Sequence, residues 1–205
     1  MRRRRVFVLA GIALSGLAAG GVLLLRQRSA GGEPVASVGG RSLTISGIGI
    51  VPYYLQNDPR WATETIGGTG GTMRAAGCTV SCIAMGVSAL GHPMDPRDVC
   101  AALKRTSGFT GSGQVIWSAV GRITDGAVRI ELPSLDYGVI DEELSEKRPV
   151  IAKIMLSETV PHWVLIVGKD GQEYLVMDPL NQEKRLVRLS GRSSLIHAIR
   201  VFRRR

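Results

Sequence analysis

Hydrophobic residues dominate one run in the first half of the chain, from Val80 to Leu90, where only two serines and one glycine interrupt the apolar positions. Apolar side chains on every side of a segment of this length predict a helix buried in the core. Gly91 and Pro93 follow the run, and both residue types end helices. Cys78 stands just before the run, so we expect it in the first turn of the buried helix.

Three further segments in the chain carry helical signals. Asp95 and Pro96 supply an N-cap and a proline for the first turn of a second helix. Residues 112–123 predict a third helix, and Asp141 is expected to cap a short fourth helix that runs through Lys147. These helices come mainly before the β-rich part of the chain.

The second half of the chain predicts strands, because short runs rich in β-branched residues are separated by turn residues. The expected strands cover residues 128–132, 150–156, 163–167, 173–177, 186–189 and 196–202. Helices first and antiparallel strands afterwards predict an α+β fold.

The N-terminus carries a different pattern, since residues 6–25 are 20 positions without a charge, preceded by four arginines and followed by two more. As a helix this segment would span about 30 Å, the thickness of a bilayer core. We therefore expect residues 1–28 to be one hydrophobic helix, either a signal-anchor or a cleaved export signal, with the following domain outside the cytoplasm. Arg4-Arg5 also resembles a twin-arginine signal, which would export a folded domain.

The segment 29–48 is rich in Gly and Ser and predicts a tether between this helix and the rest of the chain. Residues 49–205 then form a single domain, large enough for a hydrophobic core of its own.

The formal net charge of +9 is concentrated at the two ends of the chain. Six of these positive charges are arginines within residues 1–28, and four more arginines lie between Arg200 and Arg205. Only 5% of the residues are aromatic, and no nucleic-acid-reading motif is present, so we expect no nucleic-acid partner.

Cys78 is the first candidate for chemistry, because a helix N-terminus stabilises a thiolate and only the thiolate attacks. Among the three histidines, His92 would lie about 21 Å further along the same helix. His197 alternates with apolar neighbours and has no acid near it in sequence, which predicts a strand residue facing solvent or a polar partner. His162 is the remaining candidate for the base.

His162 and Asp178 lie at the two ends of a predicted β-hairpin whose turn includes residues 169–171. If the loop has three residues with Gly171 in the left-handed conformation, the two side chains share a face of the sheet and can pair directly. A two-residue turn would place them on opposite faces. In the first case Asp178 could orient the imidazole of His162, as in a thiol hydrolase.

Four motifs occur in order between Val51 and Leu189: Tyr53-Tyr54-Leu-Gln56-Asn-Asp58 with Trp61, Gly77-Cys78, His162-Trp163-Val-Leu-Ile-Val-Gly168, and Tyr174-Leu-Val-Met-Asp178-Pro179. In this combination the chain resembles the bacteriocin-processing cysteine peptidases, family thirty-nine of the cysteine peptidases, and especially their stand-alone relatives. The resemblance implies a papain-like fold with Cys78 as nucleophile, His162 as base and Asp178 as its orienter. It also implies that Gln56 supplies the side-chain donor of an oxyanion hole.

The sequence thus predicts an extracytoplasmic thiol peptidase that acts on a peptide or protein substrate and needs no cofactor or metal. Cys82 and Cys100 could form a disulfide or pack as free thiols in the core. Two other functions stay open: a catalytically inactive peptide-binding module with the same fold, and an amidase or transpeptidase acting on cell-wall peptides.

Overall fold

The computed structural model describes residues 33–68 and 70–205, so the predicted anchor or export signal at residues 1–28 lies outside the described residues. The helices and strands are β1 (Val35–Ala36), β2 (Val38–Ile45), α1 (Met73–Ala76), α2 (Cys78–Ala89), α3 (Pro96–Arg105), α4 (Ala119–Ile123), β3 (Val128–Glu131), α5 (Tyr137–Ser145), β4 (Val150–Ser157), β5 (Val160–Met177), β6 (Val187–Arg188), the 3₁₀ helix η1 (Leu189–Gly191), β7 (Leu195–Ile196) and β8 (Ala198–Arg204). Within these described ranges, no helix combines the length and apolar character needed to cross a membrane.

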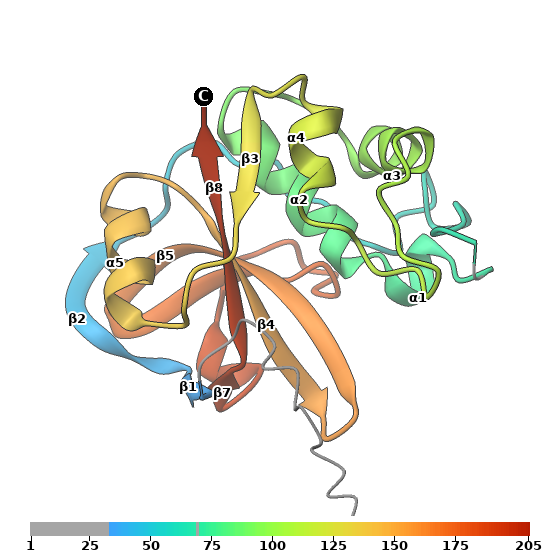
Figure 1. Ribbon diagram of the computed structural model, residues 1–205. Coiled ribbons are helices and arrows are strands. Elements are labelled where there is room, and N and C mark those ends of the chain that lie inside the picture. Colours follow the sequence, from blue (N-terminus) through green and yellow to red (C-terminus); the bar gives the residue numbers. More distant parts are fainter. Residues whose placement is uncertain (1–32, 69) are drawn as a thin grey trace, which may run out of the picture.

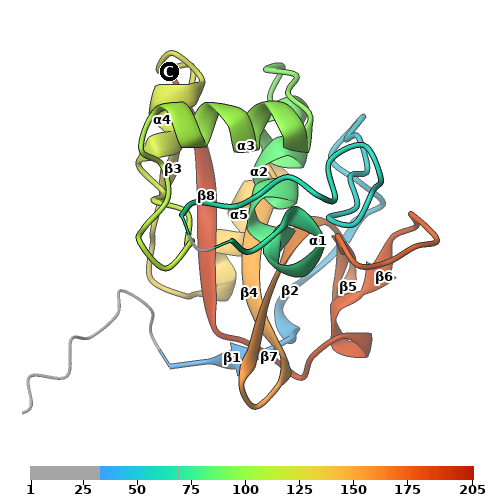
Figure 2. The same cartoon turned by 90° about the vertical axis from the view of Figure 1, so that its right-hand side faces the viewer.

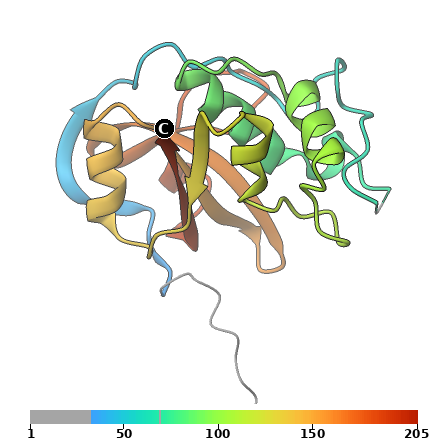
Figure 3. The ribbon, with the colours of Figure 1, turned by 45° about the horizontal axis from the view of Figure 1, so that its top comes forward.

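One antiparallel sheet organises the molecule, with strand order β2–β5–β4–β8–β3 and with β6 paired to β5. A separate pair joins β1 to β7. Helices α1 to α4 gather at one end of the molecule, whereas α5 lies beside β2 at the other (Figure 1, Figure 3). Figure 2 shows α2 passing close to the central strands, where it packs on β5 and β4. Helices and an antiparallel sheet are therefore present, as the sequence predicts.

The strand β5 must reverse direction within its length, but it does so without the predicted turn. Residues 169–171, expected as the loop of a hairpin, belong to the strand and pair with Leu43 to Ile45 of β2. A fully extended chain would put His162 and Asp178 about 50 Å apart at 3.3 Å per residue. The observed distance from His162 Nε2 to Asp178 Oδ1 is 2.7 Å. Gly171 has the predicted left-handed conformation, with a φ of +65°, although it pairs with Leu43 of β2 instead of standing in a free loop. The direct contact between His162 and Asp178 is present as predicted.

The prediction of a tether over residues 29–48 is wrong for its described part. β2 pairs with β5 along Leu43 to Ile45 and again at Val38, so this segment is an edge strand of the main sheet. Its glycines serve close packing: a Cβ on Gly39 would lie 2.4 Å from the ring of Tyr137 in α5. The partner strand lies more than 120 residues away in sequence, and local composition carries no sign of it.

Two predicted helices begin at the wrong residue. Of the helix expected over residues 112–123, only the last part is helical, as α4. Residues 112–116 form turns and an isolated bridge instead. The last helix, α5, is capped by Asp136, whose side chain accepts a hydrogen bond from Gly138 N. Asp141 instead lies inside that helix, buried, with Oδ1 only 2.5 Å from Lys169 Nζ.

The buried helix α2 is confirmed, and its close approach to the sheet depends on one glycine. A Cβ on Gly86 would lie 1.9 Å from Cζ of Phe202 in β8. The absence of a side chain at Gly86 lets the helix and the strand pack directly against each other. This contact fixes the position of α2, and hence of its N-terminus, relative to the sheet.

Candidate active site

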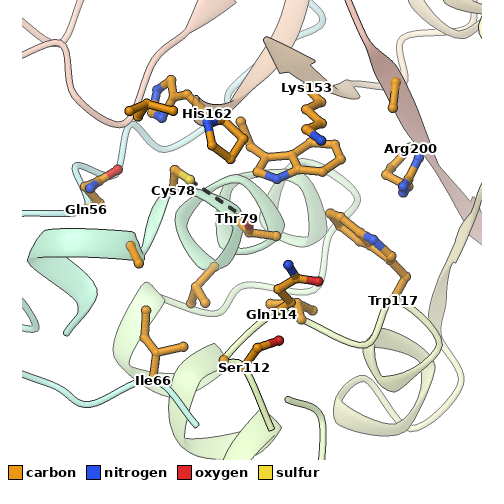
Figure 4. A pocket seen from close by; sticks show the side chains of 18 of the residues that line it. Gln56, Ile66, Cys78, Thr79, Ser112, Gln114, Trp117, Lys153, His162 and Arg200 are labelled. Carbon is orange, nitrogen blue, oxygen red and sulfur yellow. Dashed lines mark hydrogen bonds between the residues drawn. The ribbon is translucent and has the colours of Figure 1, made fainter. Parts of the chain in front are cut away.

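Cys78 is the first residue of α2, as predicted, and its side chain is nearly buried. The preceding Gly77 has no room for a side chain, because a Cβ there would lie 2.5 Å from the carbonyl oxygen of Met73. The chain therefore passes tightly from α1 into α2, and the thiol lies next to the unpaired N–H groups in the first turn of α2. Thr79 Oγ1 lies 4.0 Å from the sulfur, a weak contact that is drawn in Figure 4.

His162 reaches the thiol from the sheet. It lies on β5 opposite Ile154 of β4, and its Nε2 is 2.7 Å from Asp178 Oδ1. Because Nε2 is engaged with Asp178, Nδ1 is the nitrogen available to the Cys78 thiol. The structure thus brings together the three residues predicted as nucleophile, base and orienter.

The three groups shift each other's pKa in the direction of an ion pair. Burial alone would raise the pKa of the Cys78 thiol, yet the hydrogen bond and charge of His162 bring it below its ordinary value. Burial disfavours the imidazolium of His162, but Asp178 and Cys78 together raise its pKa to about 9. Asp178 is also buried, and its contact with His162 holds the carboxyl pKa below the usual range. Both shifts favour a thiolate next to an imidazolium over the neutral pair.

Several contacts hold Asp178 in place. Its Oδ1 also accepts a hydrogen bond from Leu180 N, at 2.8 Å. The hydroxyl of Tyr53 accepts from Asp178 N at 2.9 Å and donates to Asp178 O at 3.1 Å. Arg192 Nε lies 2.6 Å from Oδ2, an ion pair whose angles do not meet the geometry of a hydrogen bond. These contacts fix the carboxylate, and through it the imidazole ring.

Sequence reasoning assigned no role to Tyr53 or Arg192. Tyr53 belongs to the first of the four motifs, so a signal for it was present, although it did not reveal the contact with Asp178. Nothing in the sequence around Arg192 links it to Asp178, because the two meet only after the chain has turned at η1.

Gln56 lines the same cleft as Cys78 and His162, as its predicted role requires (Figure 4). Its backbone N–H donates to Pro179 O at 3.0 Å, next to Asp178. Its side-chain Nε2 donates to Arg74 O at 2.8 Å, which uses one of the two amide hydrogens and leaves the other free. The buried Oε1 has no hydrogen-bond partner among the residues that the structure describes.

The cleft extends well beyond these residues, with a volume of about 730 Å³. Figure 4 shows Gln56, Cys78 and His162 at one side, and Lys153, Trp117 and Arg200 at the other. No carboxylate is among its lining residues in the described part of the chain. Its volume lies in the range typical of ligand-binding clefts.

The other two histidines do not contact the thiol. His92 follows the C-terminal end of α2, as predicted. His197 separates β7 from β8, and its side chain lines the far part of the cleft, which sequence reasoning missed because the fold of β8 onto β4 is a long-range contact.

All three cysteines are free, so Cys82 and Cys100 are packed thiols and not a disulfide. Cys82 Sγ contacts Trp163 O at 3.4 Å, and Cys100 Sγ contacts Thr65 O at 3.5 Å. In residues 33–68 and 70–205, no cluster of three His, Cys, Asp or Glu side chains could hold a metal ion.

Comparison with known proteins points to one family. The model of the Peptidase C39 like family matches residues 49–192. A crystal structure described as a C39-like peptidase from Bacillus anthracis superposes with a TM-score of 0.50 and 13% sequence identity, covering 81% of this chain and 99% of that one. At this identity the likeness concerns the fold alone, which is a C39-like peptidase fold of mixed helices and antiparallel sheet. No curated protein resembles the chain closely enough to count as a match.

Proposed function

Because the chain belongs to the Peptidase C39 like family, we propose that it is an active cysteine peptidase with Cys78 as its nucleophile. The observation that carries this proposal is the connected set of Cys78, His162 and Asp178, which comes from a helix start and the two ends of β5. A papain-like arrangement of this kind supports cleavage of peptide bonds through an acyl-enzyme.

In the first half of the reaction, the Cys78 thiolate attacks the carbonyl carbon of the scissile bond, and the carbonyl π electrons move to oxygen. The imidazolium of His162 then gives its Nδ1 proton to the leaving amine as the C–N bond breaks. In the second half, neutral His162 takes a proton from water, whose oxygen attacks the thioester. The thiolate leaves, and the carboxylic acid product and the starting ion pair are formed.

The oxyanion of each tetrahedral intermediate needs hydrogen-bond donors. We assign this role to the backbone N–H of Cys78 and to the free Nε2 hydrogen of Gln56. The bond from Gln56 Nε2 to Arg74 O supports this assignment, because it fixes the side-chain amide in one orientation at the edge of the cleft. A rigid donor costs little reorganisation when charge develops on the substrate.

We further propose that the peptidase works outside the cytoplasm, tethered by residues 1–28 or exported by them. The proposal rests on the uncharged 20-residue segment and on the arginines that precede it. Alkaline carbonate extraction tests it: full-length protein that stays in the membrane pellet supports a retained anchor. A shortened and soluble form supports cleavage, and a full-length soluble form contradicts both.

The peptidase activity is tested with mixtures of defined peptides, analysed by mass spectrometry before and after incubation with the full-length protein. We expect cleavage products with the wild type and none with Cys78→Ser. Acid quenching during turnover should also trap a covalent adduct on the peptide that contains Cys78. Peptide binding without cleavage or adduct would replace the peptidase with an inactive peptide-binding module.

A further inference from the structure

The end of the cleft away from Gln56 carries an arginine held in an unusual environment. The guanidinium of Arg200 lies 5.0 Å from the ring centre of Trp117 and 5.2 Å from that of Trp163. The two indole rings contact each other edge to face, with centres 5.0 Å apart. Cation–π contacts with two rings hold the guanidinium plane in a fixed place on the cleft wall.

The hydrogen-bonding capacity of Arg200 is mostly unused. Its Nη1 donates to Ile199 O at 2.7 Å, and its Nε is buried without a hydrogen-bond partner. Burial also lowers the pKa of this side chain, with no acidic group acting in the other direction. A fixed and partly desolvated guanidinium with free N–H groups is suited to a planar anion such as a carboxylate.

A second cation lies beside it. Lys153 of β4 pairs across the sheet with Trp163 of β5 and with Ala198 of β8, and its side chain lines the cleft. Figure 4 shows Lys153 and Arg200 on the same side of the cleft. Two neighbouring positive charges in a partly buried site favour a negative ligand over a neutral one.

Neither cation has an acidic partner among the described residues. The other half-buried arginines are paired: Arg148 and Arg203 both contact Glu143, and Arg192 contacts Asp178. Residues 1–32 and Thr69, which the structure leaves undescribed, contain no acid at all, so they cannot neutralise the pair. The protein therefore keeps a positive charge in its cleft that its own side chains do not balance.

We propose that Arg200 and Lys153 form a subsite that binds a carboxylate of the peptide substrate. This inference rests on the proposed peptidase function and specifies its substrate. The carboxylate is either an acidic side chain or the C-terminal carboxylate of the peptide. The subsite lies in the same cleft as the reacting groups, because Lys153 and Arg200 line it together with Cys78 and His162.

The test measures binding without turnover, using the full-length protein with Cys78→Ala. The probes are dansylated hexapeptide amides with Glu at one fixed position and equal amounts of Ala, Gly, Leu and Ser at the others. A twin mixture carries Gln at the fixed position and serves as the neutral control. A third mixture has no acidic side chain but a free C-terminal carboxylate, and it is compared with the same neutral control. Fluorescence anisotropy gives the affinity of each mixture.

We expect at least one carboxylate mixture to bind roughly 10- to 100-fold more tightly than its neutral twin, as for a hydrogen-bonded charge pair. Preference for Glu at one position assigns the subsite to an acidic side chain, and preference for the free terminus assigns it to the chain end. Arg200→Gln should bring the affinity ratio close to one, whereas Arg200→Lys should retain part of it.

Arg105→Gln is the matched control, because Arg105 is an exposed arginine at the end of α3, outside the cleft, and should leave the ratio unchanged. If Arg200→Gln melts far below the wild type, Lys153→Gln provides the second measurement, with an expected loss of a few fold in the ratio. Equal affinity for all carboxylate mixtures and their twins, or no binding by any mixture, overturns the subsite. The adduct on Cys78 decides the peptidase function independently of this result.

Discussion

Replacing Asp178 with Asn should move the pH range in which Cys78 is reactive. The substitution keeps the size of the side chain and removes the charge that lies 2.7 Å from His162 Nε2. Both side chains are almost completely buried, so solvent screens their interaction little. A pKa of about 9 for His162, against its ordinary 6.5, corresponds to roughly 3 kcal/mol in favour of the protonated ring.

Without the carboxylate, we expect the pKa of His162 to fall from about 9 toward 6.5. At pH 7.5 the protonated fraction of the ring then drops from nearly all to about one tenth, if the full shift is lost. The thiolate that this imidazolium stabilises becomes scarcer in proportion. Cys78 in Asp178→Asn should therefore react more slowly at this pH, by up to about tenfold, since the part of the shift that Cys78 causes remains.

The assay is the rate of iodoacetamide labelling at Cys78 between pH 4 and 10, followed by mass spectrometry of the labelled peptide. Cys82 and Cys100 are buried and free, so they report any unfolding by becoming labelled. The wild type should label well below pH 8 and show a second change near pH 9, where His162 loses its proton. Asp125→Asn, an exposed substitution in the turn after α4, should leave this profile unchanged.

An Asp178→Asn profile that keeps the change near pH 9 and the wild-type rate at pH 7.5 would refute the argument that the carboxylate charges the imidazole. A wild-type protein that labels only near the free-thiol pKa of about 8.5, and is indifferent to His162→Ala, would favour the inactive peptide-binding module.

Four further outcomes are expected. Gln56→Ala should lower kcat for peptide cleavage by roughly 10²- to 10³-fold, while the labelling rate of Cys78 stays as in the wild type. Tyr53→Phe removes two hydrogen bonds to the backbone of Asp178 and should cost about 1–2 kcal/mol, seen as a lower midpoint in urea denaturation. Gly86→Ala should destabilise by about 1–3 kcal/mol or more in the same assay, and a urea midpoint equal to wild type would show that α2 can shift. A chain that starts at Gly49 should melt well below one that starts at Glu33, because it lacks all of β2.

The part of the site that sequence reasoning located is the part encoded by short-range signals. His162 and Asp178 are the two ends of one reversing segment, and the left-handed glycine at position 171 is enough to indicate which side chains share a face, even though no free loop forms there. Cys78 was found because an apolar run and its stop residues mark where the helix begins. Both predictions needed only residues that lie within one or two adjoining elements.

The errors concern contacts between distant parts of the chain. Residues 38–45 looked like a tether because their glycines and polar residues give no strand pattern, yet β5 supplies the hydrogen bonds. Asp141 looked like a helix cap because the sequence does not show Lys169 approaching it. In each case tertiary packing outweighed a local preference, as it commonly does in sheets.

Tertiary packing also maintains the geometry of the candidate site, whose residues come from two different parts of the fold. Cys78 belongs to a helix and His162 to the sheet, so their separation depends on how α2 packs on β5. Cys82 lies one turn after Cys78, and its Sγ contacts the carbonyl oxygen of Trp163, the residue next to His162. This buried contact ties the helix to the strand one step from the reacting groups on each side. Together with the close approach at Gly86, it makes the distance between thiol and imidazole a property of the core rather than of surface loops.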